Sequence, residues 1–376
     1  MEILIAGDLV PINSNESLLI DGDLKDHFSD FEATFNSADV FIANLECPLT
    51  HHNEKINKSG PVLKGNPKTI AGIAKLNVTL ASLANNHMGD YGEAGVKDTI
   101  ELLKQHHINK IGAGDNFEDA NAPYIYEKDG VKVGVLSYAD YEFGMVTDEA
   151  SGANPFSFIN AYNDISVLKA KVDYIITLLH DGKEYYPYPS PDLQQVCRHL
   201  VNLGSDLVVC QHSHIIGAVE SYNDSTIVYG QGNFIFDYRN NRTTDWSHGC
   251  FIKIQLEKDN RDIHLIPFKQ NYPGISLLNT EEELAFNQIM NDRSEKVKNP
   301  LFIKTSWEKF ILSKQANYLS VAFGHNLTIA RIIKKLGLSD YLVSNKVALI
   351  VLNFLRSRVH RESFISILEE KTKNQT

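Results

Sequence analysis

Five apolar runs of the sequence end abruptly in residues that bind metals or transfer protons, and this repetition constrains the fold more than any other feature. The residues at these ends are Asp8, Glu46, Asn86 with His87, His180, and His212 with His214. Short runs rich in Val, Ile and Leu are typical of buried strands. Parallel strands bring their carboxyl ends to one edge of an open α/β sheet, where ligands bind. The sequence therefore predicts one site assembled from five strand ends.

The stretch Leu83–Asp90, Leu-Ala-Asn-Asn-His-Met-Gly-Asp, is the densest of these ends and has two interpretations. Carboxamide, imidazole and carboxylate groups that follow a buried strand are suited to ligand binding. Alternatively, Asn85 or Asn86 caps the helix that we expect to begin near Glu93. Gly89 is expected to allow a tight backbone turn after these polar groups. The stretch by itself does not decide between the two interpretations.

The residue types at the other strand ends favour a metal site. Carboxylates bind hard divalent ions, and imidazoles complete sites for Zn, Mn or Fe. His212 and His214 are two positions apart. On an extended segment both rings therefore lie on one side, where they can reach one ion each or neighbouring ions. A lone histidine at a strand end is usually a capping or surface residue, but several strand ends with ligand types together predict bound metal ions.

The charge, the cysteines and the apolar runs of the sequence indicate which binding partners are improbable and where in the cell the protein is expected. The formal net charge is −11 without a long basic run, which argues against nucleic acid or an anionic membrane as the main partner. The four cysteines show no CxxC spacing and are expected to be reduced thiols. The N-terminus enters a strand without a signal-peptide pattern, and the longest late apolar run, 347–352, is too short to span a membrane. We expect a cytoplasmic protein without a transmembrane segment.

The strand patterns stop before residue 280, so we expect an α/β domain over residues 1–275 and a helical extension over residues 276–376. The helices expected in the extension are 281–290, 305–323, 326–336 and 339–370. Basic residues line some of these helices. A packed helical appendage is the plainer interpretation, and a docking site for a protein partner or an acidic surface is the alternative.

The order of the motifs resembles that of a known family. The motifs are Gly7-Asp8, Asn44-Leu45-Glu46, Ala84-Asn85-Asn86-His87, Asp90-Tyr91-Gly92, Gly112-Ala113-Gly114, His180, His212-Ser213-His214 and Gly232-Asn233-Phe234-Ile235-Phe236-Asp237. In this order they resemble the CapA family, also called the poly-gamma-glutamate or capsule biosynthesis family. That family is similar in fold to the calcineurin-like metallophosphatases. The resemblance extends over residues 1–240.

The resemblance implies a four-layer α/β/β/α metallophosphatase-like sandwich with a site for two divalent metal ions (Mn, Fe or Zn). By motif position, the ligands of one ion would be Asp8 and His214, those of the other Asn86, His180 and His212, and Glu46 would bridge the two. His87 follows the ligand Asn86, where that superfamily keeps a general acid for the leaving group. Asp90 is interpreted as an orienting partner for His87 or as a residue at the helix start.

Two departures from the family pattern affect the expected site. Asp8 is followed by Leu9 and Val10, so the Asp-x-His of the metallophosphatases is absent and one ion is short of a nitrogen ligand. Asp181 stands where the family often has a tryptophan, which changes the lining of the expected substrate site.

The expected function is hydrolysis of a phosphoester or amide bond with the help of metal ions, linked to capsule, polyglutamate or exopolysaccharide biosynthesis. The alternative is a metal-binding accessory subunit of a polymer synthesis or export complex that does no catalysis. An anionic polymer or phosphoester substrate needs local positive charge. The metal ions would supply it, with Lys183, Arg239 and Arg242 as candidate helpers.

Overall fold

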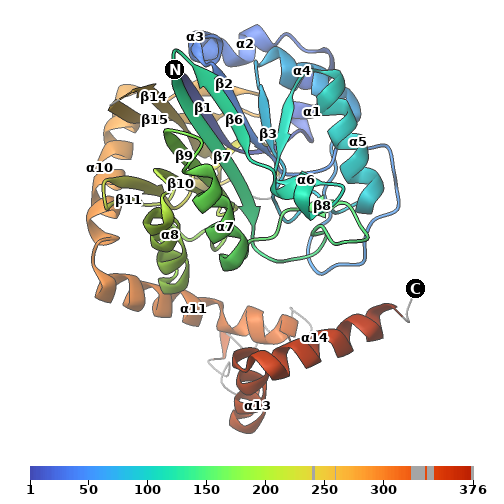
Figure 1. The fold of residues 1–376 in the computed structure, drawn as a ribbon. Helices are drawn as coiled ribbons and strands as arrows, with labels where there is room; N and C mark the ends of the chain where they lie inside the picture. The colour runs from blue at the N-terminus through green and yellow to red at the C-terminus, as the bar shows by residue number, and fades with distance from the viewer. Residues whose placement is uncertain (239–241, 259, 323–334, 337–342, 374–376) are drawn as a thin grey trace. The chain divides into compact units, whose positions relative to one another are not determined.

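The computed structural model describes residues 1–238, 242–258, 260–322, 335–336 and 343–373 (Figure 1). Contacts between Cα atoms divide the chain into two compact units, Met1–Lys304 and Thr305–Thr376, which we describe separately. Helix α10 (Thr280–Lys296) therefore belongs to the first unit. The domain boundary at residue 275 stays a prediction.

The first sheet has the strand order β16-β15-β14-β1-β2-β3-β4, with β13 also paired to β1. Its strands are β1 (Glu2–Val10), β2 (Val40–Leu45), β3 (Leu80–Ser82), β4 (Asn109–Ile111), β13 (Asn233–Phe236), β14 (His248–Glu257), β15 (Asn260–Gln270) and β16 (Ile275–Leu277). Strands β1 to β4 are parallel, whereas β14 to β16 add an antiparallel edge. Strand β1 was expected to end at Asp8, but it continues to Val10 because β13 pairs with it beyond an irregularity in register.

The second sheet has the order β11-β12-β10-β9-β7-β6. Its strands are β6 (Tyr124–Lys128), β7 (Val131–Ala139), β9 (Tyr174–His180), β10 (Leu207–Gln211), β11 (Val219–Tyr222) and β12 (Ser225–Val228). A hairpin around Asp129 and Gly130 joins β6 to β7. A small ribbon pairs β5 (Ala113–Gly114) with β8 (Gly152–Ala153).

Helices cover the outer faces of both sheets. Those of the first unit are α1 (Ser14–Asp21), α2 (Leu24–Phe28), α3 (Glu32–Ser37), α4 (Ile70–Lys75), α5 (Gly92–Gln105), α6 (Phe117–Asn121), α7 (Phe158–Leu168), α8 (Pro191–Leu203), α9 (Thr244–Ser247) and α10, with short 3-10 turns at Ser29–Phe31 and Pro67–Thr69. Helices α1 to α5 pack their apolar residues on one sheet, and α7 and α8 pack on the other.

The alternation of side chains along β1 explains the layers. Ile3 and Ile5 join a core between the two sheets, which the second sheet completes with residues such as Val133. Leu4 and Ala6 point to the opposite face and pack under the helices. The fold is therefore the expected four-layer α/β/β/α sandwich, with one apolar core between the sheets and one outside each sheet.

The second unit continues α11 (Pro300–Ala322), which begins in the first unit, and contains α13 (Asn345–Arg356) and α14 (Arg358–Lys373). The prediction of a single helix over residues 339–370 was wrong, because the backbone of Ser357 is extended and separates α13 from α14. The helix expected at 326–336 lies almost wholly outside the described residues.

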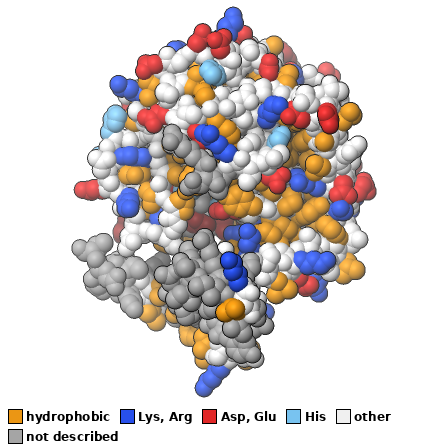
Figure 2. Space-filling model, turned by 180° about the vertical axis from the view of Figure 1, so that it is seen from behind, with side chains coloured by type: hydrophobic (Ala, Val, Ile, Leu, Met, Phe, Trp, Pro, Cys, Tyr) orange, Lys and Arg blue, Asp and Glu red, His pale blue; other side chains and the backbone are white. Residues whose placement is uncertain are grey.

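Charge and hydropathy are mixed on the molecular surface. On the face in Figure 2, Lys and Arg side chains lie interspersed with Asp and Glu side chains and with apolar ones.

Among the described residues, no helix combines the length and the apolar character that a membrane crossing requires.

Candidate metal centre

The strand ends of both sheets meet as the sequence predicts. In the first sheet Asp8, two residues before the end of β1, pairs in register with Asn44 of β2. In the second sheet His180 of β9 pairs with Gln211 of β10, one residue before His212. The two sheets face each other, so the polar side chains at these ends converge on one buried site.

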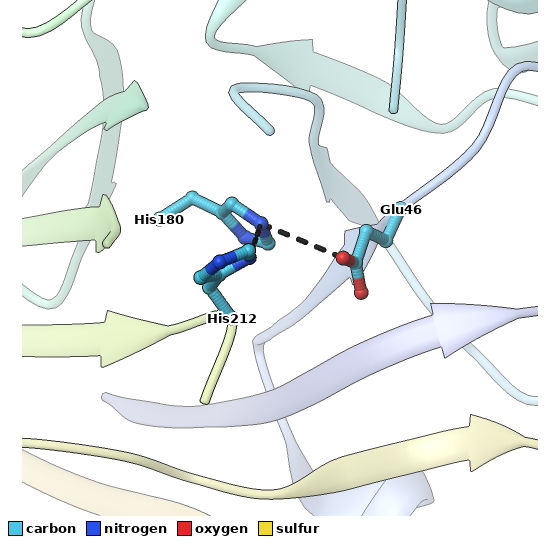
Figure 3. A group of neighbouring side chains, drawn as sticks. All are labelled: Glu46, His180 and His212. Carbon is cyan, nitrogen blue, oxygen red and sulfur yellow. Dashed lines mark hydrogen bonds and ion pairs between the residues drawn. The ribbon is translucent and has the colours of Figure 1, made fainter. Parts of the chain in front are cut away.

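Glu46, His180 and His212 form the first group of donors (Figure 3). One donor atom from each of them lies within 4.8 Å of the other two. Nε2 of His180 lies 3.5 Å from Oε1 of Glu46 and 3.1 Å from Nδ1 of His212. Asn86 lies beside this group, with its Oδ1 3.1 Å from the same Nε2 of His180.

Asp8, Glu46 and His214 form the second group, again with donor atoms within 4.8 Å of one another. Nδ1 of His214 lies 3.1 Å from Oδ2 of Asp8. The carboxylate of Glu46 belongs to both groups. The geometry thus brings together all six residues that the sequence predicts as ligands, in the two sets that the resemblance implies, and their role as ligands stays a prediction.

The carboxylate of Glu46 provides a test of whether a metal fits. The side chain is fully buried, and neither of its oxygens has a hydrogen-bond partner among the described residues. Burial, together with the nearby charge of Asp8, raises the pKa of Glu46 well above its usual value. An unpaired buried carboxylate is costly unless a cation or a proton compensates it. A divalent ion shared by the two donor groups would fit this position.

The histidines of the two groups differ in charge for a physical reason. Burial lowers the pKa of His212 to about 3 and that of His180 well below its usual value. Both imidazoles are therefore neutral near pH 7, which is the form that binds metals. Burial also disfavours the charged form of His214, but Glu46 and Asp8 outweigh it and raise its pKa to about 9. The position between these two carboxylates thus favours positive charge.

The turn after β10 explains how two histidines two positions apart serve different groups. His212 and His214 have φ angles of 94° and 57°, in the left-handed region that non-glycine residues seldom adopt. The expectation of an extended segment was therefore wrong, although the two rings do lie near each other, with their centroids 5.9 Å apart. Such backbone conformations cluster at functional sites, because the surrounding structure must enforce them.

Asn44 holds both sheets in place at the site. Its Nδ2 donates a hydrogen bond to Oδ1 of Asp8 at 2.7 Å and lies 3.0 Å from Nδ1 of His180. Asn85 in turn donates to Oδ1 of Asn44 and to the carbonyl of Leu45, and its own Oδ1 accepts from the backbone N–H of His87 and Met88. Asn85 therefore stabilises the turn that follows β3. The expectation that Asn85 or Asn86 caps the next helix was wrong, because the N-cap of α5 is Tyr91 and no side chain caps it.

His87 is buried and its Nδ1 lies 2.7 Å from Oδ2 of Asp90, which confirms the expected contact between the two. A carboxylate only accepts hydrogen bonds, so Nδ1 of His87 carries a proton and donates a hydrogen bond to Asp90. Nε2 is then the ring nitrogen available for proton transfer to or from a substrate. Lys58 completes the group from a long loop: its Nζ donates to Oδ1 of Asp90 at 2.6 Å and to the carbonyl of Asn86 at 2.8 Å. The side chain of Lys58 is only 2% exposed. Sequence reasoning missed it, because the loop of residues 50–66 has no periodicity.

A cavity of about 170 Å³ opens beside the first donor group. Its lining consists of Asn86, Asp140, Glu142, His180, Asp181, Gly182, Lys183 and His212. Burial and the charge of Asp140 raise the pKa of Asp181 to about 7. The residue that replaces the family's tryptophan therefore makes this lining acidic, with Lys183 as a cation beside it.

Arg242 and Arg239 are the other two residues that were expected to supply positive charge to an anionic substrate. Arg242 forms a bidentate ion pair with Asp237, at 2.7 Å and 2.8 Å from Oδ1. Its partner is thus a carboxylate of this chain. Arg239 lies outside the described residues.

The missing nitrogen ligand of β1 also has a structural explanation. Val10 stands where the metallophosphatases have the histidine of Asp-x-His, and it is fully buried in an apolar cluster with Phe236 and Trp246. Cys47, which follows Glu46, belongs to the same cluster, and burial raises the pKa of its thiol well above the usual value. A thiol in that state is inert rather than nucleophilic.

The two facing sheets and the helices outside them define a four-layer α/β/β/α protein, and donor groups that could hold metal ions converge at its strand ends. The chain belongs to the family described as bacterial capsule synthesis protein PGA_cap, which matches residues 2–238.

The chain is similar in sequence to CapA proteins of two Bacillus species. The chain is 31% identical over 239 residues to the PGA biosynthesis protein CapA of Bacillus subtilis, a match that covers 62% of this chain and 61% of that protein. It is 30% identical over 218 residues to the capsule biosynthesis protein CapA of Bacillus anthracis, covering 56% of this chain and 53% of that protein. The matched segment thus spans little more than half the length of these relatives. A hypothetical protein of Thermus thermophilus has a similar crystal structure, with a TM-score of 0.43, 13% identity, and coverage of 72% of this chain and 99% of that one.

Proposed function

We propose that this chain is a metal-dependent hydrolase that cleaves a phosphoester or amide bond in the synthesis or processing of a capsule or polyglutamate-type polymer. The observation that carries the proposal is the buried carboxylate of Glu46, which has no hydrogen bond among the described residues and lies between two sets of nitrogen and oxygen donors, beside the pair of His87 and Asp90. The names of the bacillus relatives refer to PGA and capsule biosynthesis, which suggests the anionic polymer or its precursor as substrate.

Asp8 and His214 would hold one divalent ion, His180, His212 and Asn86 the other, and Glu46 would contact both. Ions bound there would lower the pKa of water and polarise the scissile group. The protein's own residues have separate tasks. In its cationic form His87 would donate the proton on Nε2 to the leaving group, while Asp90 accepts the hydrogen bond from Nδ1–H and holds the ring in place. Lys58 holds Asp90 in place, and the cavity beside His212 would receive the substrate.

A second candidate is an accessory subunit that binds metal without catalysis. The observation that favours it is the apolar environment of Val10, which leaves the group of Asp8 and His214 without the usual nitrogen ligand from β1. In this case the metal ions would stabilise the strand ends only.

Metal analysis and hydrolysis assays separate the two candidates. Purified wild type would be compared with Asp8→Ala, His87→Ala and His212→Ala for bound Mn, Fe and Zn, and for cleavage of a phosphomonoester, a phosphodiester and a γ-glutamyl amide. We expect His87→Ala to keep its metal and lose activity, whereas the other two lose both. His51→Ala, in an exposed loop, is the control. Metal-loaded wild type that cleaves none of these substrates would favour the accessory role, and full activity of His212→Ala would refute the site.

A further inference from the structure

Helix α13 keeps large apolar side chains exposed although α14 packs beside it. Val347, Ile350 and Leu355 are 40%, 48% and 54% exposed. The contact with α14 includes Phe354, whose ring lies 5.2 Å from that of Phe364. Exposed apolar surface of this extent on one helix is typical of a surface that binds something.

The sequence of α13 separates polar from apolar residues around the helix. Lys346, Asn353 and Arg356 follow one another at spacings of seven and three, which places them on one side. Val347, Ile350 and the partly buried Phe354 follow at spacings of three and four on another side. The helix is therefore amphipathic, with a broad apolar face and a narrow polar face that carries cations.

The charge of this segment is opposite to that of the whole chain. Between Val343 and Arg361 there is no Asp or Glu, whereas the Lys and Arg residues are Lys346, Arg356, Arg358 and Arg361. The chain as a whole has a net charge of −11. The overall charge, from which we expected no anionic membrane as main partner, therefore does not describe this segment.

We propose that α13 binds the surface of a membrane that contains anionic lipids. The helix would lie in the plane of the interface, with its apolar face among the acyl chains and its cations near the lipid phosphates. Its 12 residues are too few to cross a bilayer, which needs about 20. The proposal uses no residue of the metal centre and is independent of the hydrolase proposal.

Charge complementarity favours this occupant over the others. A second copy of α13 would cover the apolar face but would offer no negative charge to Lys346 and Arg356, because α13 has no Asp or Glu. Nucleic acid would match the cations but would leave the apolar face in water. An anionic bilayer satisfies both faces of the helix at once, because it offers negative charge and an apolar interior within a few ångströms.

Vesicle sedimentation with the full chain tests the proposal. Vesicles of phosphatidylcholine with phosphatidylglycerol would be compared with vesicles of phosphatidylcholine alone, and self-association would be followed by light scattering. We expect sedimentation with the anionic vesicles, about tenfold weaker binding to neutral vesicles, and loss of binding at high salt. Absence of binding to the anionic vesicles, or equal binding to both kinds, would overturn the proposal.

Paired variants separate membrane binding from general changes of charge or hydropathy. Lys346→Glu with Arg356→Glu, and Ile350→Ser with Leu355→Ser, are each expected to reduce binding about tenfold or more. The matched controls on exposed positions of the first unit are Lys68→Glu with Lys104→Glu, and Ile159→Ser with Val167→Ser. Circular dichroism would establish that each variant is folded. Equal loss in the controls, or a dimer that depends on α13 without any vesicle binding, would overturn the proposal.

Discussion

The carboxylate of Asp90 meets Nδ1 of His87 at 2.7 Å, and both side chains are buried. Both oxygens of Asp90 have further partners. Lys58 donates a hydrogen bond to Oδ1, and the backbone N–H of Leu63 donates one to Oδ2. The loop of residues 50–66 therefore helps to set the orientation of the histidine that we propose as the general acid. Under the proposed function, stability and activity both depend on the carboxylate of Asp90, and substitutions can separate the two effects.

Asp90→Asn is expected to damage both properties. It leaves the ammonium of Lys58 buried without its counter-charge, which costs about 3–5 kcal/mol of unfolding free energy. It also replaces a carboxylate, which can only accept, by an amide, which can donate to Nδ1 of His87 as well. The proton on Nδ1 is then no longer fixed, so hydrolysis should fall by about 10²–10⁴-fold, the usual contribution of general acid catalysis. Urea denaturation and the rate of ester or amide cleavage measure the two effects.

The double variant Asp90→Asn with Lys58→Met distinguishes them. It removes the uncompensated charge, so most of the lost stability should return, while the activity should stay low because His87 still lacks its carboxylate. Recovery of full activity in the double variant would contradict the positioning role of Asp90.

Glu46→Gln tests the shared carboxylate. In the presence of a chelator the variant should be at least as stable as wild type, because a neutral amide costs less to bury than a carboxylate without a hydrogen bond. Addition of Mn or Zn at about 100 times the dissociation constant should stabilise the wild type by about 2.7 kcal/mol and the variant much less. Thermal unfolding with and without metal measures both. A variant that responds to metal as strongly as the wild type would remove Glu46 from the site.

The strand ends could be predicted from the sequence because each apolar run and its polar end are local features. The registers of β1 with β2 and of β9 with β10 then place Asp8, Glu46 and His180 together, as expected for parallel strands. The division of the ligands into two groups that share Glu46 followed from the family resemblance only. Spacing alone left open whether His212 and His214 reach one ion or two.

Other features depend on long-range packing and leave no local signal. Lys58 lies in a polar loop without periodicity, and only the folded loop brings it to Asp90. The left-handed backbone of His212 is enforced by its surroundings, not by a glycine. The break at Ser357 lies between two arginines without the proline or glycine that usually marks a helix end, so the pattern predicted one continuous helix.

Asp237 should make the stability depend on acid pH. Burial of its side chain opposes ionisation, but hydrogen bonds from Ser14 and Arg242 outweigh it and lower the pKa below its usual value. A carboxyl with a lowered pKa in the folded state stabilises the protein above its unfolded pKa of about 3.9. This contribution is lost as the pH falls through the lower, folded pKa.

Asp237→Asn should therefore cost about 1.5–3 kcal/mol at pH 7, the usual value of hydrogen bonds to a charged group. The difference from wild type should shrink below about pH 4, where the wild-type carboxyl also takes up its proton. Denaturant titrations across this pH range measure it, with Asp148→Asn on an exposed loop as the control. A difference that stays constant with pH would show that Asp237 contributes by packing and not by charge.

Gly89→Ala should disturb the cavity through a neighbouring loop. The sequence suggested that Gly89 permits a tight turn, but the structure gives a different reason for the glycine: its φ is not in the left-handed region, and an added Cβ would lie 2.5 Å from the carbonyl oxygen of Gly144. The backbone of Gly144 would have to move, and the same loop carries Asp140 and Glu142 into the cavity lining.

This overpacking should cost about 1–3 kcal/mol of unfolding free energy. It should also change the KM for substrate more than the metal content, because the loop of Gly144 that must move carries Asp140 and Glu142 of the cavity wall but none of the proposed metal ligands. Denaturation, metal analysis and steady-state kinetics on one preparation measure the three quantities. Unchanged KM together with the expected loss of stability would show that the loop does not contribute to substrate binding.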